Sequence, residues 1–180
     1  QLARTRNIGP ITFQRLLQIY TTPQAALAAL PELSLRGGRK TALKIASLAS
    51  ARDELATTRA HQGEYLIWGQ AGYPGPLSHI ADAPIALAAF GHLSLLKRPI
   101  IAMVGSRNAL AAGQRLAQEL SQGLSRHGIV VVSGLARGID TVAHRHAIDG
   151  GTIAVLGNGI SHTYPLENKE LQGKIIAGGL

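Results

Sequence analysis

The architecture of this chain follows from one segment, Val130-Val131-Val132-Ser133-Gly134-Leu135-Ala136-Arg137-Gly138-Ile139-Asp140. The apolar, mostly β-branched run that starts at Ile129 predicts a buried strand. The glycines, serine and arginine that follow predict a loop, and a helical pattern begins near Asp140. Strand, glycine loop and helix in this order direct backbone N–H groups and a helix N-terminus towards an anion.

The same pattern occurs on either side of this segment, at residues 100–108 and 152–159. We therefore expect strands at 100–104, 129–132 and 152–156, alternating with helices at about 109–127, 140–149 and 165–177. In the first of these helices the expected buried stripe is Leu110, Leu116, Ala117, Leu120 and Leu124. Alternation of this kind predicts an α/β fold, a Rossmann-like parallel sheet with helices on both faces. The three strand-to-helix loops then lie on one edge of the sheet, where ligands of such sheets bind.

Residues 1–62 predict a small all-α domain, and residues 63–180 the α/β domain. Helices are expected over 12–20, over 22–30 with a stop before Pro31, and over 41–60, with a strand at 64–69. The turn Asn7-Ile8-Gly9-Pro10 has two interpretations. It fits a helix-hairpin-helix module that holds a DNA phosphate, or a plain turn in a helical bundle. A single glycine turn carries little information, which favours the plain turn.

Composition narrows the classes of function. Among 180 residues the net charge is +8, which favours a polyanionic partner, and aromatic residues make up only 4%, too few for an extensive base-stacking surface. Cysteine is absent, which excludes disulfides and thiolate chemistry. No apolar run approaches the ~18 residues of a membrane span, and no signal-peptide pattern is present, so we expect a cytoplasmic protein.

The loops hold the candidate phosphate ligands, which combine hydroxyls, guanidinium groups and glycine backbone. From the residues themselves these are Gly105, Ser106, Arg107, Asn108, Ser133, Gly134, Arg137, Gly138, Gly157, Asn158 and Gly159. Asn108 is a candidate N-cap, and Asp140 is expected to cap free N–H groups at a helix start, within reach of His144 one turn later. Metal-ligand spacing, a dinucleotide fingerprint and a P-loop are all missing, so the sequence predicts no metal, no cofactor and no catalytic residues.

Taken together, these motifs resemble the DNA-processing protein A (DprA/Smf) family of natural transformation. The resemblance rests on Val104–Arg107, Val132–Asp140 with Ala143-His144, Ile153–Gly159, and Tyr164-Pro165 with Asn168. It implies an extended Rossmann-like domain behind a SAM or helix-hairpin-helix module. It further implies a homodimer, without enzymatic activity, that binds single-stranded DNA, protects it and loads RecA recombinase.

Carried over by position, the resemblance adds Lys169 to the DNA contacts and makes Asp140, His144, Tyr164 and Asn168 structural supports of the site. The chain departs from the family at Ala112, where an aromatic residue is common. We also expect the α/β domain to be truncated at its C-terminal end.

Two other functions remain open. One is a nucleotide or sugar-phosphate hydrolase similar to the LOG family, with Asp140, His144 or Glu167 in catalysis, although that family's glycine-rich Pro-Gly-Gly-x-Gly-Thr segment is absent. The other is a scaffold whose main role is protein contact. Release of free base from nucleoside monophosphates distinguishes the first from DNA binding.

Overall fold

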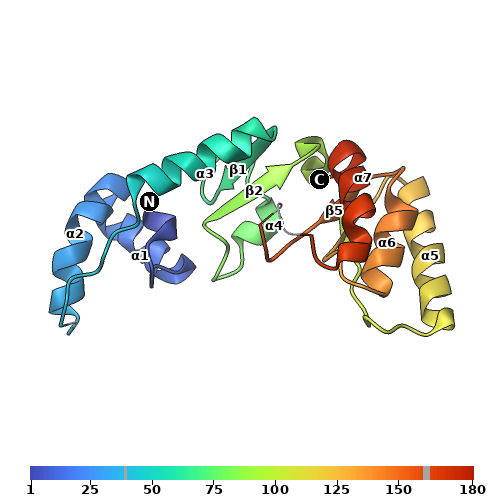
Figure 1. The fold of residues 1–180 in the computed structure, drawn as a ribbon, viewed down its shortest axis with the longest axis horizontal. Coiled ribbons are helices and arrows are strands. Elements are labelled where there is room, and N and C mark those ends of the chain that lie inside the picture. The colour runs from blue at the N-terminus through green and yellow to red at the C-terminus, as the bar shows by residue number, and fades with distance from the viewer. Residues whose placement is uncertain (39, 160–162) are drawn as a thin grey trace. The chain divides into compact units, whose positions relative to one another are not determined.

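The computed structural model describes residues 1–38, 40–159 and 163–180. The chain divides into two compact units, Gln1–Ala89 and Phe90–Leu180 (Figure 1). The boundary expected after residue 62 separates an all-α domain from an α/β domain and not two compact units, and it stays a prediction.

The first unit is built on helices. A short 3-10 helix, η1 (Leu2–Arg4), precedes α1 (Pro10–Tyr20), α2 (Pro23–Arg36) and α3 (Leu48–Ala60). Thr22 and Ser47 cap α2 and α3, because each side-chain oxygen accepts a backbone N–H of the first turn. The buried core of this unit consists of Leu2, Ile8, Phe13, Leu16, Ala26, Leu30, Leu43 and Ile85.

Two of the predicted helix boundaries were wrong. Helix α2 does not stop before Pro31 but continues through it to Arg36, because Leu33 in the added turn packs against the core. The third helix starts at Leu48, not at residue 41. The segment before it is extended, with Leu43 buried and its N–H donated to Ser34 Oγ at 2.8 Å.

The rest of the first unit is a two-stranded sheet of β1 (Gly63–Ile67) and β2 (Ala86–Phe90), with a single helical turn, α4 (Gly75–Ser78), between them. Strand β1 confirms the strand expected at residues 64–69. Tyr73 fixes the connection, because its hydroxyl donates to the carbonyl of Pro84 at 2.7 Å.

The second unit contains a parallel sheet in the order β3-β4-β5, formed by Ile100–Ala102, Val130–Ser133 and Thr152–Ala154. The register pairs Ala102 with Val132, and Ser133 with Ala154. The helices are α5 (Ala111–Arg126), α6 (Ile139–Ala147) and α7 (Lys169–Gly178), with short 3-10 helices η2 (Leu93–Lys97) and η3 (Leu166–Asn168). The predicted parallel α/β arrangement is confirmed.

The two faces of this sheet are covered by different layers. Side chains alternate along β4, so Val130 contacts Leu95 of η2 and Ile153, while Val131 contacts Ala143 and Ala147 of α6. Helix α7 packs through Leu171 and Ile175 against the loop residue Leu135, with Ala154 of β5 beside them. Helices α5, α6 and α7 lie side by side in Figure 1.

The predicted apolar stripe of α5 was only partly correct. Ala117 is buried, but Leu110, Leu116 and Leu120 are 82%, 57% and 50% exposed. The helix turns Ala117 and Ser121 inwards because it packs against α6 and β4, the neighbours on one side of its axis. The face of α5 that carries Leu116 and Leu120 is therefore not the face that the helix buries, which carries Ala117 and Ser121.

Candidate nucleic-acid interface

Three strand-to-helix loops lie along the carboxyl edge of the β3-β4-β5 sheet. Parallel pairing places the ends of the strands next to one another, so the loops that follow them, beginning at residues 103, 134 and 155, start side by side. Residues 160–162 of the third loop lie outside the described residues. We use "central loop" for residues 133–138, which are the last residue of β4 and the loop that follows it.

The first loop interlocks with the central loop. The backbone N–H of Ile139 donates to the carbonyl of Ser106 at 3.2 Å, which ties the first loop to the start of α6. Gly138 has φ of 75°, and a Cβ there would lie 2.7 Å from the carbonyl oxygen of Arg107. Only glycine allows this approach, so the backbone at Ser106 and Arg107 rests directly on Gly138.

The expected N-cap at Asn108 was wrong. Helix α5 starts at Ala111 with Leu110 as its N-cap residue, and no side chain caps it. The Asn108 backbone N–H instead donates to Ser106 Oγ at 3.1 Å, so the serine hydroxyl shapes the turn.

Asp140 stabilises the central loop through two hydrogen bonds. Its Oδ2 accepts the backbone N–H groups of Gly134 and Ala136 at 3.1 and 3.3 Å, and the residue is buried. The expected role as a cap of the helix was therefore wrong, because the carboxylate binds amides of the loop and no side chain caps α6. These two amides are unavailable to a ligand.

Asn168 of η3 forms hydrogen bonds to the same loop. Its Nδ2 donates to the carbonyls of Leu135 and Ala136 at 2.9 and 3.3 Å, and lies 2.8 Å from Thr141 Oγ1. Thr141 Oγ1 in turn donates to the Ala136 carbonyl at 2.7 Å. Asn168 is 2% exposed, so these bonds are shielded from water. The central loop is a rigid backbone platform held by three side chains.

His144 supports the sheet through a buried hydrogen bond. Its Nδ1 lies 2.8 Å from Thr152 Oγ1, which donates its own proton to the Val131 carbonyl, so Nδ1 carries the imidazole proton. Burial lowers the pKa of His144 to about 4, opposed in part by the charge of Asp140 and by the backbone of Ser133. The described hydrogen bonds join His144 to Thr152, not to Asp140, and the ring is neutral at physiological pH.

The cationic side chains of the edge differ in their partners. Arg107 and Lys169 are exposed, and neither forms an ion pair with any residue that the structure describes. Arg137 donates to Glu167 across 2.7 Å, with both side chains more than half exposed. The sequence placed Glu167 near the loops as a possible acid, but gave no sign that it pairs with Arg137.

The remaining candidate residues differ in exposure. Gly157, Asn158 and Gly159 are exposed at the start of the third loop. Ser133 Oγ is buried and has no hydrogen-bond partner within the described part of the chain. Tyr164 is 67% exposed, so the supporting role expected of it stays a prediction.

This arrangement suits anion binding better than acid–base chemistry. Asp140 is occupied by loop amides and His144 is neutral and buried, so neither can exchange a proton with a ligand at the edge. Among residues 1–38, 40–159 and 163–180, no cluster of three metal-binding side chains occurs. No helix in those ranges is long and apolar enough to cross a bilayer.

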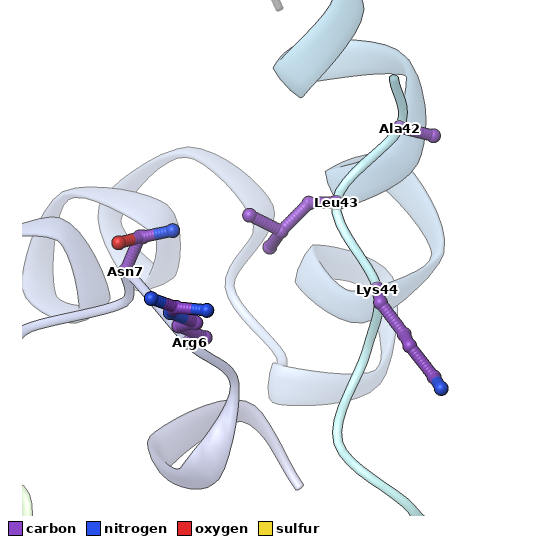
Figure 2. Close-up of a pocket in the computed structure, with 5 residues that line it drawn as sticks. All are labelled: Arg6, Asn7, Ala42, Leu43 and Lys44. Carbon is purple, nitrogen blue, oxygen red and sulfur yellow. The ribbon is translucent and has the colours of Figure 1, made fainter.

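The first unit has its own basic hollow. A cavity of about 300 Å³ lies between the turn at Arg6 and Asn7 and the extended segment at Ala42, Leu43 and Lys44 (Figure 2). Figure 2 shows the Leu43 side chain reaching towards the turn, while that of Lys44 points away from it. The two cations of this hollow do not converge on one point.

Two family models cover most of the chain. Residues 64–180 match the family described as DNA recombination-mediator protein A, and residues 1–57 match the DprA-like N-terminal HHH domain. The second match contradicts the preference for a plain turn at Asn7–Pro10, because it makes this turn part of a helix-hairpin-helix domain.

Individual relatives agree with these matches. The chain is 49% identical to DNA processing protein DprA of Streptococcus pneumoniae over 105 residues, which cover 57% of this chain and 37% of that protein. It is 32% identical to protein Smf of Synechocystis over 190 aligned residues, covering 99% of this chain and 48% of that protein. The chain thus spans less than half the length of these curated relatives.

Solved structures share the fold. The crystal structure of DprA from Streptococcus pneumoniae is similar with a TM-score of 0.61 and 40% identity, covering 71% of this chain and 44% of that one. DNA processing protein A from Helicobacter pylori, whose structure is described for its single-stranded DNA binding mode, gives a TM-score of 0.58 and 26% identity, covering 64% and 53%. The chain belongs to the DNA recombination-mediator protein A family, the DprA/Smf proteins.

Proposed function

We propose that this chain binds single-stranded DNA along the carboxyl edge of the β3-β4-β5 sheet. One observation carries the proposal. The central loop is held rigid by Asp140, Thr141 and Asn168 while Arg107 and Lys169 stand beside it without carboxylate partners among the described residues. A preformed backbone platform flanked by cations recognises phosphates and carries little base specificity.

The phosphate contacts proposed are the backbone of Gly105, Ser106 and Gly138 together with the cations Arg107, Arg137 and Lys169. The candidate residues Asn108, Ser133, Gly134, Gly157, Asn158 and Gly159 complete the edge as its turns and as further polar groups. Because Asp140 takes the Gly134 amide, Gly134 contributes its small size and not its N–H.

The wider role proposed is that of the family. The protein protects incoming single strands and loads RecA recombinase during DNA uptake in natural transformation, in the cytoplasm and as a homodimer. The support is family membership, since the Helicobacter pylori relative is described as binding single-stranded DNA. RecA loading is measured as the protein's stimulation of DNA-dependent ATP hydrolysis by RecA, and protection as survival of labelled strands with a nuclease.

The direct experiment is a salt titration of binding to labelled single- and double-stranded oligonucleotides. Arg107→Ala is expected to weaken single-strand binding on the order of tenfold for every sequence, because a charge-assisted phosphate contact contributes about 1.5 kcal/mol or more. The slope of log K against log salt is expected to flatten by about one contact.

The matched control is Arg126→Ala. Arg126 is exposed at the end of α5, whose start lies at the loop edge, and has no ion-pair partner in the described part of the chain. It removes the same charge at the opposite edge of the same unit. Equal affinities and salt slopes for Arg107→Ala and Arg126→Ala would contradict the proposed site.

A further inference from the structure

One arginine of the loop edge already has an anion beside it. Arg137 Nη2 lies 2.7 Å from Glu167 Oε1, whereas Arg107 has no such partner among the described residues. A phosphate that uses Arg137 must therefore take the position that this carboxylate occupies.

The position of Glu167 is built into the fold. Its neighbour Asn168 is buried and hydrogen-bonded to the carbonyls of Leu135 and Ala136, one residue before Arg137. Asp140 holds the same loop through the Ala136 amide. The backbones that carry Glu167 and Arg137 are thus fixed next to each other, and only the two side chains remain able to move.

A second position for this carboxylate lies on its other side. A hollow of about 350 Å³ between α6 and α7 is lined by Arg145, Ile148, Glu167, Glu170, Leu171 and Lys174. Lys174 is already paired with Glu170 at 2.7 Å. Arg145 has no ion-pair partner in the part of the chain that the structure describes, although it helps Lys174 to lower the pKa of Glu170.

We propose that Glu167 is an internal competitor for the DNA phosphate at Arg137, and that its carboxylate moves to Arg145 when a strand binds. The inference rests on the proposed single-strand binding at this edge. It makes the edge selective for polyanions. A free phosphate or mononucleotide gains too few contacts to displace Glu167, while a strand that also engages Arg107 supplies them within one molecule.

The test measures the Kd of the full chain for a labelled oligothymidylate at low salt. Glu167→Gln removes the competing charge and keeps the shape, and is expected to tighten binding about two- to fivefold, the range of an exposed ion pair. The gain is expected to shrink at higher salt, because exposed pairs are screened. Inorganic phosphate is expected to compete with the strand at lower concentration in this variant than in the parent chain.

The matched control is Glu170→Gln. It removes the same charge three positions further along the chain, from a carboxylate that pairs with Lys174 and not with a loop arginine. A gain equal to that of Glu167→Gln would show a general effect of net charge and would overturn the inference.

Two further variants test the two positions of the carboxylate. The gain from Glu167→Gln is expected to vanish when Arg137→Ala is also present. Arg145→Gln is expected to weaken binding about twofold in the parent chain and to have no effect in the Glu167→Gln background, because Arg145 influences strand binding only through the displaced carboxylate of Glu167. An Arg145→Gln effect that persists without Glu167 would show that Arg145 binds the strand itself, and would remove the second position.

The measurements distinguish a failure of single-strand binding from a failure of competition by Glu167. If the parent chain binds no single-stranded DNA, the proposed function is wrong and this inference falls with it. If the parent chain binds and Glu167→Gln matches it in both Kd and sensitivity to phosphate, only the inference is wrong. These side chains are exposed, so little change in thermal stability is expected.

Discussion

Replacement of Asn168 by aspartate changes only which atoms donate hydrogen bonds at a buried position. The Nδ2 group donates to the carbonyls of Leu135 and Ala136 and contacts Thr141 Oγ1, all within 3.3 Å. Asn168→Asp puts an acceptor oxygen where this donor stood, at a residue 2% exposed. The two carbonyl oxygens then lose a partner and face a like-charged atom.

The cost can be worked from those bonds. Asn168→Ala leaves the Leu135 carbonyl unpaired and the Ala136 carbonyl with Thr141 Oγ1 alone, and is expected to lower the free energy of unfolding by about 1–3 kcal/mol. Asn168→Asp is expected to cost about 1–2 kcal/mol more at neutral pH, because a buried carboxylate beside carbonyl oxygens loses its hydration without gaining donors. Affinity for single-stranded DNA is expected to fall with both variants, since the central loop loses its lateral support.

The difference in free energy of unfolding between Asn168→Asp and Asn168→Ala is expected to depend on pH. The carboxyl group that Asn168→Asp introduces is buried and faces acceptors, so its pKa in the fold lies above its unfolded value of about 3.9. A group with a raised folded-state pKa stabilises fully below its unfolded pKa and loses that contribution as pH rises through the folded value. The gap between Asn168→Asp and Asn168→Ala is therefore expected to be smallest near pH 4 and to widen towards pH 7.

Urea unfolding followed by circular dichroism at several pH values measures this gap, and each pair of variants is compared at the same pH. Comparison at one pH removes contributions from other titrating groups, which both variants share. A gap that does not change with pH would refute the account of Asn168 as a donor to two carbonyls.

Three other perturbations have expected outcomes. His144 is neutral in the fold with a pKa of about 4 but protonates near 6.5 in the unfolded chain. The free energy of unfolding is therefore expected to fall by on the order of 3 kcal/mol as pH drops from about 6.5 to about 4. His144→Leu is expected to lack this component in thermal melts at several pH values. Gly138→Ala places a Cβ against the Arg107 carbonyl at a φ of 75°. It is expected to lower the free energy of unfolding in urea by about 2 kcal/mol or more, and to weaken DNA binding as well. Leu116→Ala is expected to change stability by less than about 0.5 kcal/mol, whereas Ala117→Leu is expected to cost about 1–3 kcal/mol; the reverse order would restore the buried stripe first expected for α5.

The parallel sheet and its loop edge were predictable because they depend on local patterns. Strand-like apolar runs that end in loops with small or basic residues are repeated three times, and right-handed crossovers between parallel strands place the loops on one edge. The extent of α2 was not predictable in this way. Pro31 usually ends a helix, and only the packing of Leu33 on a core gathered from distant segments explains why the helix continues.

The supports of the loop show a second limit. Asp140 lies six residues from Gly134, and the sequence predicted that it binds nearby amides, but it assigned those amides to the helix and not to the loop. Asn168 bonds to residues more than thirty positions away, and Glu167 meets Arg137 only because Asn168 is bonded there. Spacing in sequence carries no signal for such contacts, so Asn168 entered the site through family resemblance and the Glu167 pair was missed.

The same contacts explain how one edge can be both rigid and adjustable. Hydrogen bonds from the buried residues Asp140 and Asn168 fix the backbone of the central loop. Loss of such a bond lowers the free energy of unfolding by about 1–3 kcal/mol, because water cannot replace it. The charges that face a strand are held by an exposed pair, Arg137 with Glu167, which contributes about 1 kcal/mol or less. Variants of the first kind are therefore expected to change stability and DNA affinity together. Variants of the second kind are expected to change affinity alone, and that separation distinguishes the residues that shape the edge from those that bind the strand.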